Sequence, residues 1–154
     1  MDVSQYLEIF IDESNEHLQN LSDQLMILEK EPENSDTINE IFRAAHSLKG
    51  MAGTMGYKRM QNLTHDMENV FSEVRNGNIK VNASMVDCLF QCLDALEEYV
   101  TNILEAFSKM PSTKRRSLLK LGKDVSEANE EFDKMTRGGQ TNKNENEGDM
   151  SQTK

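Results

Sequence analysis

The chemistry of this chain is most clearly indicated around one histidine. The segment FRAAHSLKGMAGTMG, residues 42–56, places His46 among small side chains, with Lys49 at i+3, Gly50 at i+4 and Gly53 at i+7. At helical spacing these residues lie on the side of the helix that carries the imidazole. A glycine inside a helix costs about 1 kcal/mol relative to alanine, so we interpret the pair as a surface kept open around His46. Helix termination or close helix packing is the alternative use of such glycines.

The charge around His46 differs from the charge of the whole chain. The formal net charge of the chain is −10, yet the interval 41–65 contains no acidic residue. Its basic residues are Arg43, Lys49, Lys58 and Arg59. A basic island centred on one histidine suits an anionic group attached to the imidazole, or an acidic partner surface.

A carboxylate for this histidine is expected from the next helix. His65 and Glu68 are three residues apart, and Glu68 lies at the edge of an apolar stripe, as His46 does. In an antiparallel hairpin these edges meet, and a carboxylate that accepts the Nδ1–H of His46 would leave the Nε2 lone pair outward. Such a nucleophile suits phosphoryl transfer, which needs mainly positioning and nearby positive charge. His65 and Glu68 as an ordinary i,i+3 pair remain the simpler alternative.

Four helices must position these residues. Apolar side chains recur at spacings of three and four residues from about residue 2 to 29, 35 to 56, 58 to 75 and 84 to 107. Short connections favour antiparallel neighbours, so we predict an all-α, antiparallel four-helix bundle over residues 3–108. The core stripe of the second helix is expected to hold Ile38, Ile41, Phe42, Ala45, Leu48 and Ala52, with His46 at its solvent edge.

The remainder of the chain is expected to extend this domain. A heptad-like apolar row predicts a fifth helix over about residues 112–136, so that the domain covers residues 1–136. Residues 137–154 lack aromatic and β-branched apolar residues, which predicts a flexible linker or tail.

Composition excludes several classes of protein. The net charge of −10 argues against nucleic-acid binding, and no run approaches the roughly 18 apolar residues of a membrane span. The N-terminus has no basic start and no cleavage site for a signal peptide, so we expect a cytoplasmic protein without membrane insertion. Cys88 and Cys92 are interpreted as reduced thiols near a core edge.

Three motifs, in order along the chain, match a known family. They are YLEIFIDESNEHLQNL, INEIFRAAHSLKGMAGTMGY and LTHDMENVFSEVRNG, and the similarity covers roughly residues 4–107. The chain resembles the N-terminal histidine phosphotransfer (HPt) domains of the CheA family of bacterial chemotaxis histidine kinases. The resemblance implies that His46 is phosphorylated at Nε2, that Glu68 orients it and that Lys49 contacts the phosphoryl group. It also implies a supporting role for His65, and Gly50 matches the small residue that the family has beside its histidine.

The resemblance further implies a relay. A separate ATP-binding kinase domain of the same protein, acting within a dimer, would phosphorylate His46, and an aspartate of a CheY-type or CheB-type response regulator would then take the group. ATP and Mg²⁺ would belong to those partners, so this chain is expected to be a phosphocarrier without a cofactor or metal, and its parent a protein histidine kinase. The expected access and partner surface consists of Arg43, Gly50, Gly53, Lys58 and Arg59.

Two other functions remain as alternatives. A metal-binding helical bundle could use His46, His65 and Glu68, with His17 as a further ligand, although the surrounding basic residues would repel a cation. A non-catalytic helical adaptor could bind partners through its methionines, but Met60 and Met67 have the spacing of core residues. We interpret His17 itself as structural, because it lies near the apolar row of the first helix and has no cleared face.

Overall fold

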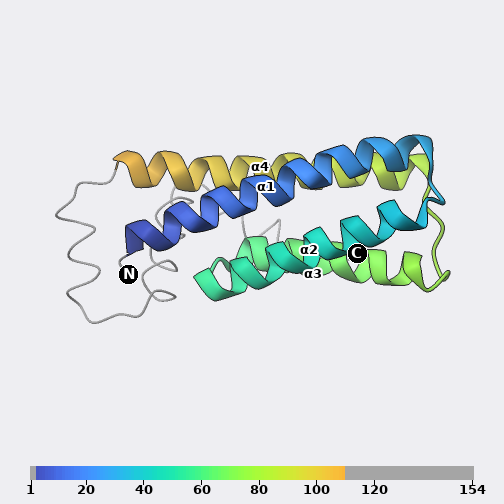
Figure 1. The fold of residues 1–154 in the computed structure, drawn as a ribbon, viewed down its shortest axis with the longest axis horizontal. Coiled ribbons are helices and arrows are strands. Elements are labelled where there is room, and N and C mark those ends of the chain that lie inside the picture. The colour runs from blue at the N-terminus through green and yellow to red at the C-terminus, as the bar shows by residue number, and fades with distance from the viewer. Residues whose placement is uncertain (1–2, 110–154) are drawn as a thin grey trace, which may run out of the picture.

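A computed structural model describes residues 3–109, which form four helices. These are α1 (Val3–Lys30), α2 (Ser35–Met55), α3 (Lys58–Arg75) and α4 (Ala83–Lys109). Consecutive helices run in opposite directions, with α1 beside α4 and α2 beside α3 (Figure 1). The predicted antiparallel four-helix bundle is therefore confirmed, whereas the predicted fifth helix (112–136) and tail (137–154) lie outside the described residues.

The ends of α2 are fixed by the residues that flank it. The side-chain oxygen of Asn34 accepts a hydrogen bond from the backbone N–H of Thr37 at 3.1 Å, which caps the first turn. Gly56 adopts φ 79°, a left-handed conformation that glycine reaches without steric cost, and its N–H bonds to carbonyls of the last turn. The helix therefore ends near Gly56, as the sequence predicts.

A single buried tyrosine joins the two helices of the α2–α3 hairpin. Tyr57 is fully buried, and its ring meets the edges of Phe10 and Tyr99 at centroid distances of 5.1 and 5.9 Å. Edge-to-face pairs of this kind add to the free energy gained by burying the rings. Because Tyr57 contacts both α1 and α4, it fixes the hairpin against the other half of the bundle.

The core follows the predicted apolar stripe of α2, with Phe42 at its edge. Buried positions on α2 include Ile38, Ile41, Ala45, Leu48 and Ala52. Met60 and Met67 are also buried, as expected of core methionines. Phe42, expected in the core, is half-buried and packs against the core from its edge. Tyr6, which has the spacing of the apolar row predicted for the first helix, is exposed.

The helix surfaces can be compared with two predictions from the sequence, the lack of a membrane span and the two reduced cysteines. None of the four described helices is both long enough and apolar enough to cross a membrane. On α4, Cys88 is exposed and Cys92 is half-buried, and they form no disulfide. Both line a groove of about 650 Å³ between α3 and α4.

Candidate functional site

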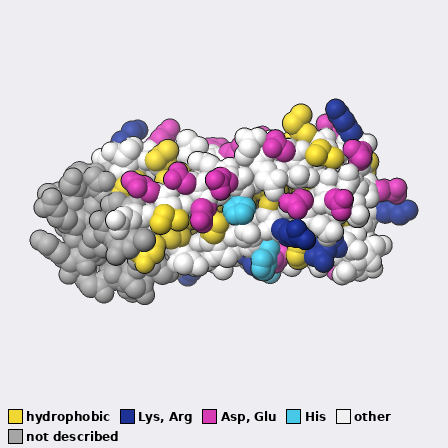
Figure 2. All heavy atoms as spheres, viewed as in Figure 1, with side chains coloured by type: hydrophobic (Ala, Val, Ile, Leu, Met, Phe, Trp, Pro, Cys, Tyr) yellow, Lys and Arg dark blue, Asp and Glu magenta, His cyan; other side chains and the backbone are white. Residues whose placement is uncertain are grey.

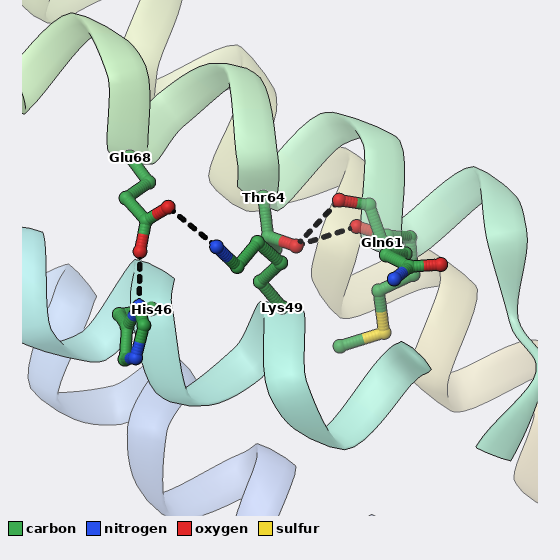
Figure 3. A network of polar contacts seen from close by, with 6 residues as sticks. His46, Lys49, Gln61, Thr64 and Glu68 are labelled. Carbon is green, nitrogen blue, oxygen red and sulfur yellow. Dashed lines mark hydrogen bonds and ion pairs between the residues drawn. The ribbon is translucent and has the colours of Figure 1, made fainter. Parts of the chain in front are cut away.

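His46 is presented on the solvent side of α2, near the middle of the helix. Its side chain is 65% exposed, and its Nδ1 is hydrogen-bonded to Oε2 of Glu68 on α3. The second ring nitrogen, Nε2, points away from Glu68 and out of the helix pair (Figure 3). The predicted contact between these two helix edges is therefore present in the structure.

Glu68 is a buried carboxylate that two basic groups hold from α2. Its side chain is 11% exposed, and Oε1 accepts a hydrogen bond from Nζ of Lys49 at 2.6 Å (Figure 3). Burial raises the pKa of Glu68, but the hydrogen bonds from Lys49 and His46 and the positive charge of Lys49 outweigh it, so the pKa lies below its ordinary value. Glu68 is consequently ionised at neutral pH.

The charge state of Glu68 determines the tautomer of His46. An ionised carboxylate only accepts hydrogen bonds, so the proton of the contact belongs to Nδ1 of His46. With Nδ1 protonated, the neutral imidazole carries its lone pair on Nε2, the nitrogen that points outward. The site therefore presents a nucleophilic nitrogen to solvent.

His65 does not join this contact network. It lies on an exposed part of α3, one turn before Glu68. Among residues 3–109, no hydrogen bond or ion pair links it to His46, Lys49 or Glu68. The simpler i,i+3 pair with Glu68 is not formed either, so the supporting role of His65 stays a prediction.

The basic residues of the interval 41–65 make different contacts and lie at different distances from His46. Arg43 forms an ion pair with Glu40 at 3.4 Å. The guanidinium of Arg59 lies over the ring of Tyr99, 5.7 Å from its centroid. Lys58 and Arg59 also follow the end of α2, about 14 Å along the helix from His46. Lys49 is thus the member that contacts the site, whereas Arg43 lies one turn before His46 on α2, and a basic partner surface made by Arg43, Lys58 and Arg59 stays a prediction.

The two glycines that were interpreted as open surface differ from each other. A Cβ built on Gly50 would have no neighbouring atom within 4 Å, so this position is open. At Gly53 the same Cβ would lie 2.7 Å from Nε2 of Gln61 on α3, too close for real contacts. Gly53 is therefore covered by the flexible end of the Gln61 side chain, whereas Gly50 is open, and the role of the two glycines as an access surface stays a prediction.

A groove beside His46 contains a histidine that we interpreted as structural. His17 of α1 is half-buried and lines this groove of about 620 Å³ together with His46 and Gly50. Figure 2 shows one histidine over α1 and one over α2 on the same face, with apolar side chains beyond them. Sequence reasoning missed this proximity because it depends on how α1 packs against α2.

Two other residues near the site were also missed. Thr64 of α3 is buried one turn before Glu68, and its hydroxyl donates to the carbonyl oxygens of Met60 and Gln61 (Figure 3). Arg75, near the end of α3, lies with its guanidinium carbon 4.3 Å from the ring centroid of Phe42. Since α3 is antiparallel to α2, only the register of the hairpin reveals that Arg75 and Phe42 meet.

The metal-binding alternative has no ligand set in the described part of the chain. Within residues 3–109, no three His, Cys, Asp or Glu side chains lie close enough together to hold a metal ion. The carboxylate of Glu68 already binds the ammonium of Lys49 and the ring of His46.

Comparison with known proteins identifies the family. The family model described as the Hpt domain matches residues 5–105, which is more than half of the chain. The chain belongs to the Hpt domain family. The matched segment contains the whole network around His46 and nearly all of the described bundle.

Curated relatives of this Hpt domain are much longer proteins. Chemotaxis protein CheA of Bacillus subtilis is 50% identical over 105 residues, which is 68% of this chain and 16% of the relative. Chemotaxis protein CheA of Listeria monocytogenes is also 50% identical, over 63% of this chain and 16% of the relative. The chain thus spans about a sixth of the length of the curated relatives it matches.

A solved structure with the same fold covers the domain itself. The CheA phosphotransferase domain from Thermotoga maritima is 47% identical, with a TM-score of 0.63, and the match covers 65% of this chain and 95% of that one. The similarity therefore extends over nearly the whole of that separately solved domain.

Proposed function

We propose that this Hpt domain is the phosphoryl-carrying domain of a CheA-type chemotaxis kinase, with His46 as the phosphorylated residue. Its Nε2 would accept the γ-phosphoryl group of ATP bound to a kinase domain and pass it to an aspartate of a response regulator. The observation that carries the proposal is the hydrogen bond from Nδ1 of His46 to the ionised Glu68, which leaves the nucleophilic nitrogen exposed. The similarity to CheA proteins supports the same assignment.

The bonding changes of the first step balance without a proton leaving the site. The Nε2 lone pair of His46 attacks the γ-phosphorus of ATP, an N–P bond forms, and the bridging P–O bond breaks to release ADP. The ring then carries a positive charge while Nδ1 keeps its hydrogen. Glu68 already accepts that N–H, so its negative charge stabilises the ring as the positive charge develops.

The second step reverses the changes at nitrogen. A carboxylate oxygen of the regulator's aspartate attacks phosphorus, the N–P bond breaks, and its electron pair returns to Nε2. Glu68 holds the same hydrogen throughout, so His46 returns to the tautomer from which it began. A carrier that needs no proton exchange can accept and release the group repeatedly.

Lys49 has a separate role in this scheme. Its ammonium is bound to Glu68 before phosphorylation, and its side chain is one turn beyond His46 on the same helix. Once His46 carries the negatively charged phosphoryl group, we propose that the flexible side chain of Lys49 turns toward that group. Glu68 keeps its hydrogen bond to Nδ1 of His46. Lys49 thereby offsets charge in both states.

The partners follow from the same proposal. The kinase domain would belong to the same polypeptide and act within a dimer, and the receivers would be response regulators of the CheY and CheB type. ATP and Mg²⁺ would be bound by those partners, which makes this domain a phosphocarrier of a protein histidine kinase. A cytoplasmic location stays a prediction.

Phosphorylation by the parent kinase domain tests the function directly. The 154-residue chain is incubated with that domain and labelled ATP, and the label is located by mass spectrometry. We expect acid-labile, base-stable label on the peptide that contains His46 and none in His46→Gln, whose melting curve should match the wild type. Label on His17 or His65, or label that survives His46→Gln, would overturn the proposal.

A further inference from the structure

The exposure of His46 leaves its ring orientation to very few contacts. The side chain is 65% exposed, so the surrounding core does not fix it. The hydrogen bond to Glu68 holds one atom, Nδ1, of a ring that can otherwise turn about its χ2 bond. A site that requires Nε2 to point outward therefore needs a second constraint on the plane of the ring.

Phe42 provides a surface parallel to that ring. It lies one turn before His46 on α2, and the two rings are inclined by only 9° with their centroids 6.4 Å apart. Offset parallel rings at such distances attract each other. Because Phe42 is half-buried against the core, its ring is held more firmly than the exposed imidazole.

Arg75 covers the ring of Phe42 from α3. Its guanidinium carbon is 4.3 Å from the ring centroid, within the range of a cation–π contact. Arg75 is exposed, and among residues 3–109 no carboxylate forms an ion pair with it. The guanidinium of Arg75 therefore contacts the aromatic ring of Phe42 and no carboxylate among the described residues.

The contacts of Glu68 and Arg75 share one helix register. These residues are seven apart, which places both on the same side of α3, and their targets His46 and Phe42 are four apart on α2. Helix α3 thus acts on the imidazole in two ways. Glu68 bonds to it directly, and Arg75 contacts Phe42, whose ring lies parallel to it. A disturbance of either contact should change how the ring is held.

We infer that Arg75 and Phe42 are positioning residues that keep the imidazole of His46 in the plane that points Nδ1 at Glu68 and Nε2 at the phosphoryl donor. The inference rests on the proposed function of His46. Arg75 acts through Phe42 by its flat guanidinium, which stacks on the ring, and its positive charge alone is insufficient. Neither residue touches the reacting atoms.

Two measurements on the 154-residue chain test this role. Nitrogen-15 NMR of the unphosphorylated protein gives the fraction of His46 that carries its hydrogen on Nδ1. The initial rate of phosphorylation of His46 by phosphoramidate, a small donor that needs no partner protein, gives the reactivity of Nε2. Melting curves confirm that each variant is folded before it is compared.

The variants separate stacking from charge. We expect Phe42→Leu, Arg75→Ala and Arg75→Lys each to lower the rate about three- to tenfold and to raise the fraction of the Nε2–H tautomer. Phe42→Tyr, which keeps the ring, should retain the wild-type rate. Because Arg75 acts through Phe42, the double variant Phe42→Leu with Arg75→Ala should be no slower than Phe42→Leu alone. Lys30→Ala, which removes an exposed positive charge at the end of α1, is the matched control for charge.

Three outcomes would overturn the inference. They are unchanged rates and tautomers in all three single variants, a wild-type rate in Arg75→Lys, and multiplied losses in the double variant. The last two would mean that Arg75 acts by its charge on the phosphoryl group. If the wild-type chain takes no phosphate on His46 but the tautomer still shifts in the variants, the proposed function fails and the positioning role stands.

Discussion

The α2–α3 hairpin and the α1–α4 pair are built from similar helices but bury different chemistry. Among the described residues, α4 buries only apolar side chains and α1 buries one polar side chain, that of Ser14. The hairpin buries the polar or charged side chains of Thr37, Thr64 and Glu68. Thr64 and Glu68 have hydrogen-bond partners, whereas the hydroxyl of Ser14 has none among residues 3–109.

The difference shows how one bundle divides two tasks. Apolar side chains stabilise α1 against α4 through the burial of surface, which is insensitive to the charge of any group. A buried carboxylate such as Glu68 is tolerated only because Lys49 and His46 offset the cost of removing it from water. The α2–α3 hairpin therefore contains the charged site, and apolar burial in the α1–α4 pair stabilises the bundle that holds it.

The largest expected effect is on the stability of the α1–α4 pair. Leu21→Ala should lower the free energy of unfolding by about 2–5 kcal/mol, because Leu21 is fully buried and its truncation leaves a cavity. Chemical denaturation followed by circular dichroism measures the loss. Phosphorylation of the folded fraction should stay at the wild-type rate, and a large loss there would contradict the division between the two helix pairs.

The next largest effect is expected on the rate at which His46, in the α2–α3 hairpin, is phosphorylated. Glu68→Gln should lower the rate of His46 phosphorylation by about 10- to 100-fold, because an amide neither fixes the Nδ1–H tautomer nor balances the positive ring. Single-turnover phosphorylation by the parent kinase domain measures this change. Leu21→Ala provides the matched comparison, and equal rate losses in both variants would remove the basis for the distinction.

Acid should weaken the hairpin through the same carboxylate. The pKa of Glu68 in the folded chain lies below its ordinary value of 4.5, so the folded state favours the ionised form. Its contribution to stability is therefore complete above about pH 4.5 and is lost as pH falls through the lowered pKa.

The pH dependence is measured as a difference between variants. The free energy of unfolding of the wild type minus that of Glu68→Gln should shrink when pH falls from 7 to the acid range. The deficit of Leu21→Ala, which involves no titrating group, should stay constant over the same range. A wild-type advantage over Glu68→Gln that grows in acid would contradict the lowered pKa.

The smallest effect is expected at the buried hydroxyl of α1. Ser14→Ala should leave the free energy of unfolding unchanged or raise it by about 1 kcal/mol, because a buried hydroxyl without a hydrogen-bond partner is removed. Thermal denaturation measures the change against the wild type. A loss of more than about 1 kcal/mol would show that Ser14 has a partner in solution, such as a bound water.

The sequence by itself determined the elements and the central pair of the site. Apolar residues at spacings of three and four define four helices, and Gly56 ends the second because its backbone must turn. The contact of His46 with Glu68 was also predictable, since the sequence places each residue at the edge of an apolar stripe and a short connection makes these helices neighbours. Local periodicity and chain connectivity carry all of this information.

Only the tertiary structure decided which side chains meet across the helices. It directed Lys49 to Glu68, paired Arg43 with Glu40, set Arg59 over Tyr99 and placed Gln61 against Gly53. It also moved Phe42 from the expected core to the edge, where Arg75 covers its ring. Such contacts depend on the axial register and rotation of packed helices, which are set by the shapes of all the interlocking side chains together. A sequence pattern identifies the face of a helix, whereas the packing of the bundle selects the neighbour of each residue.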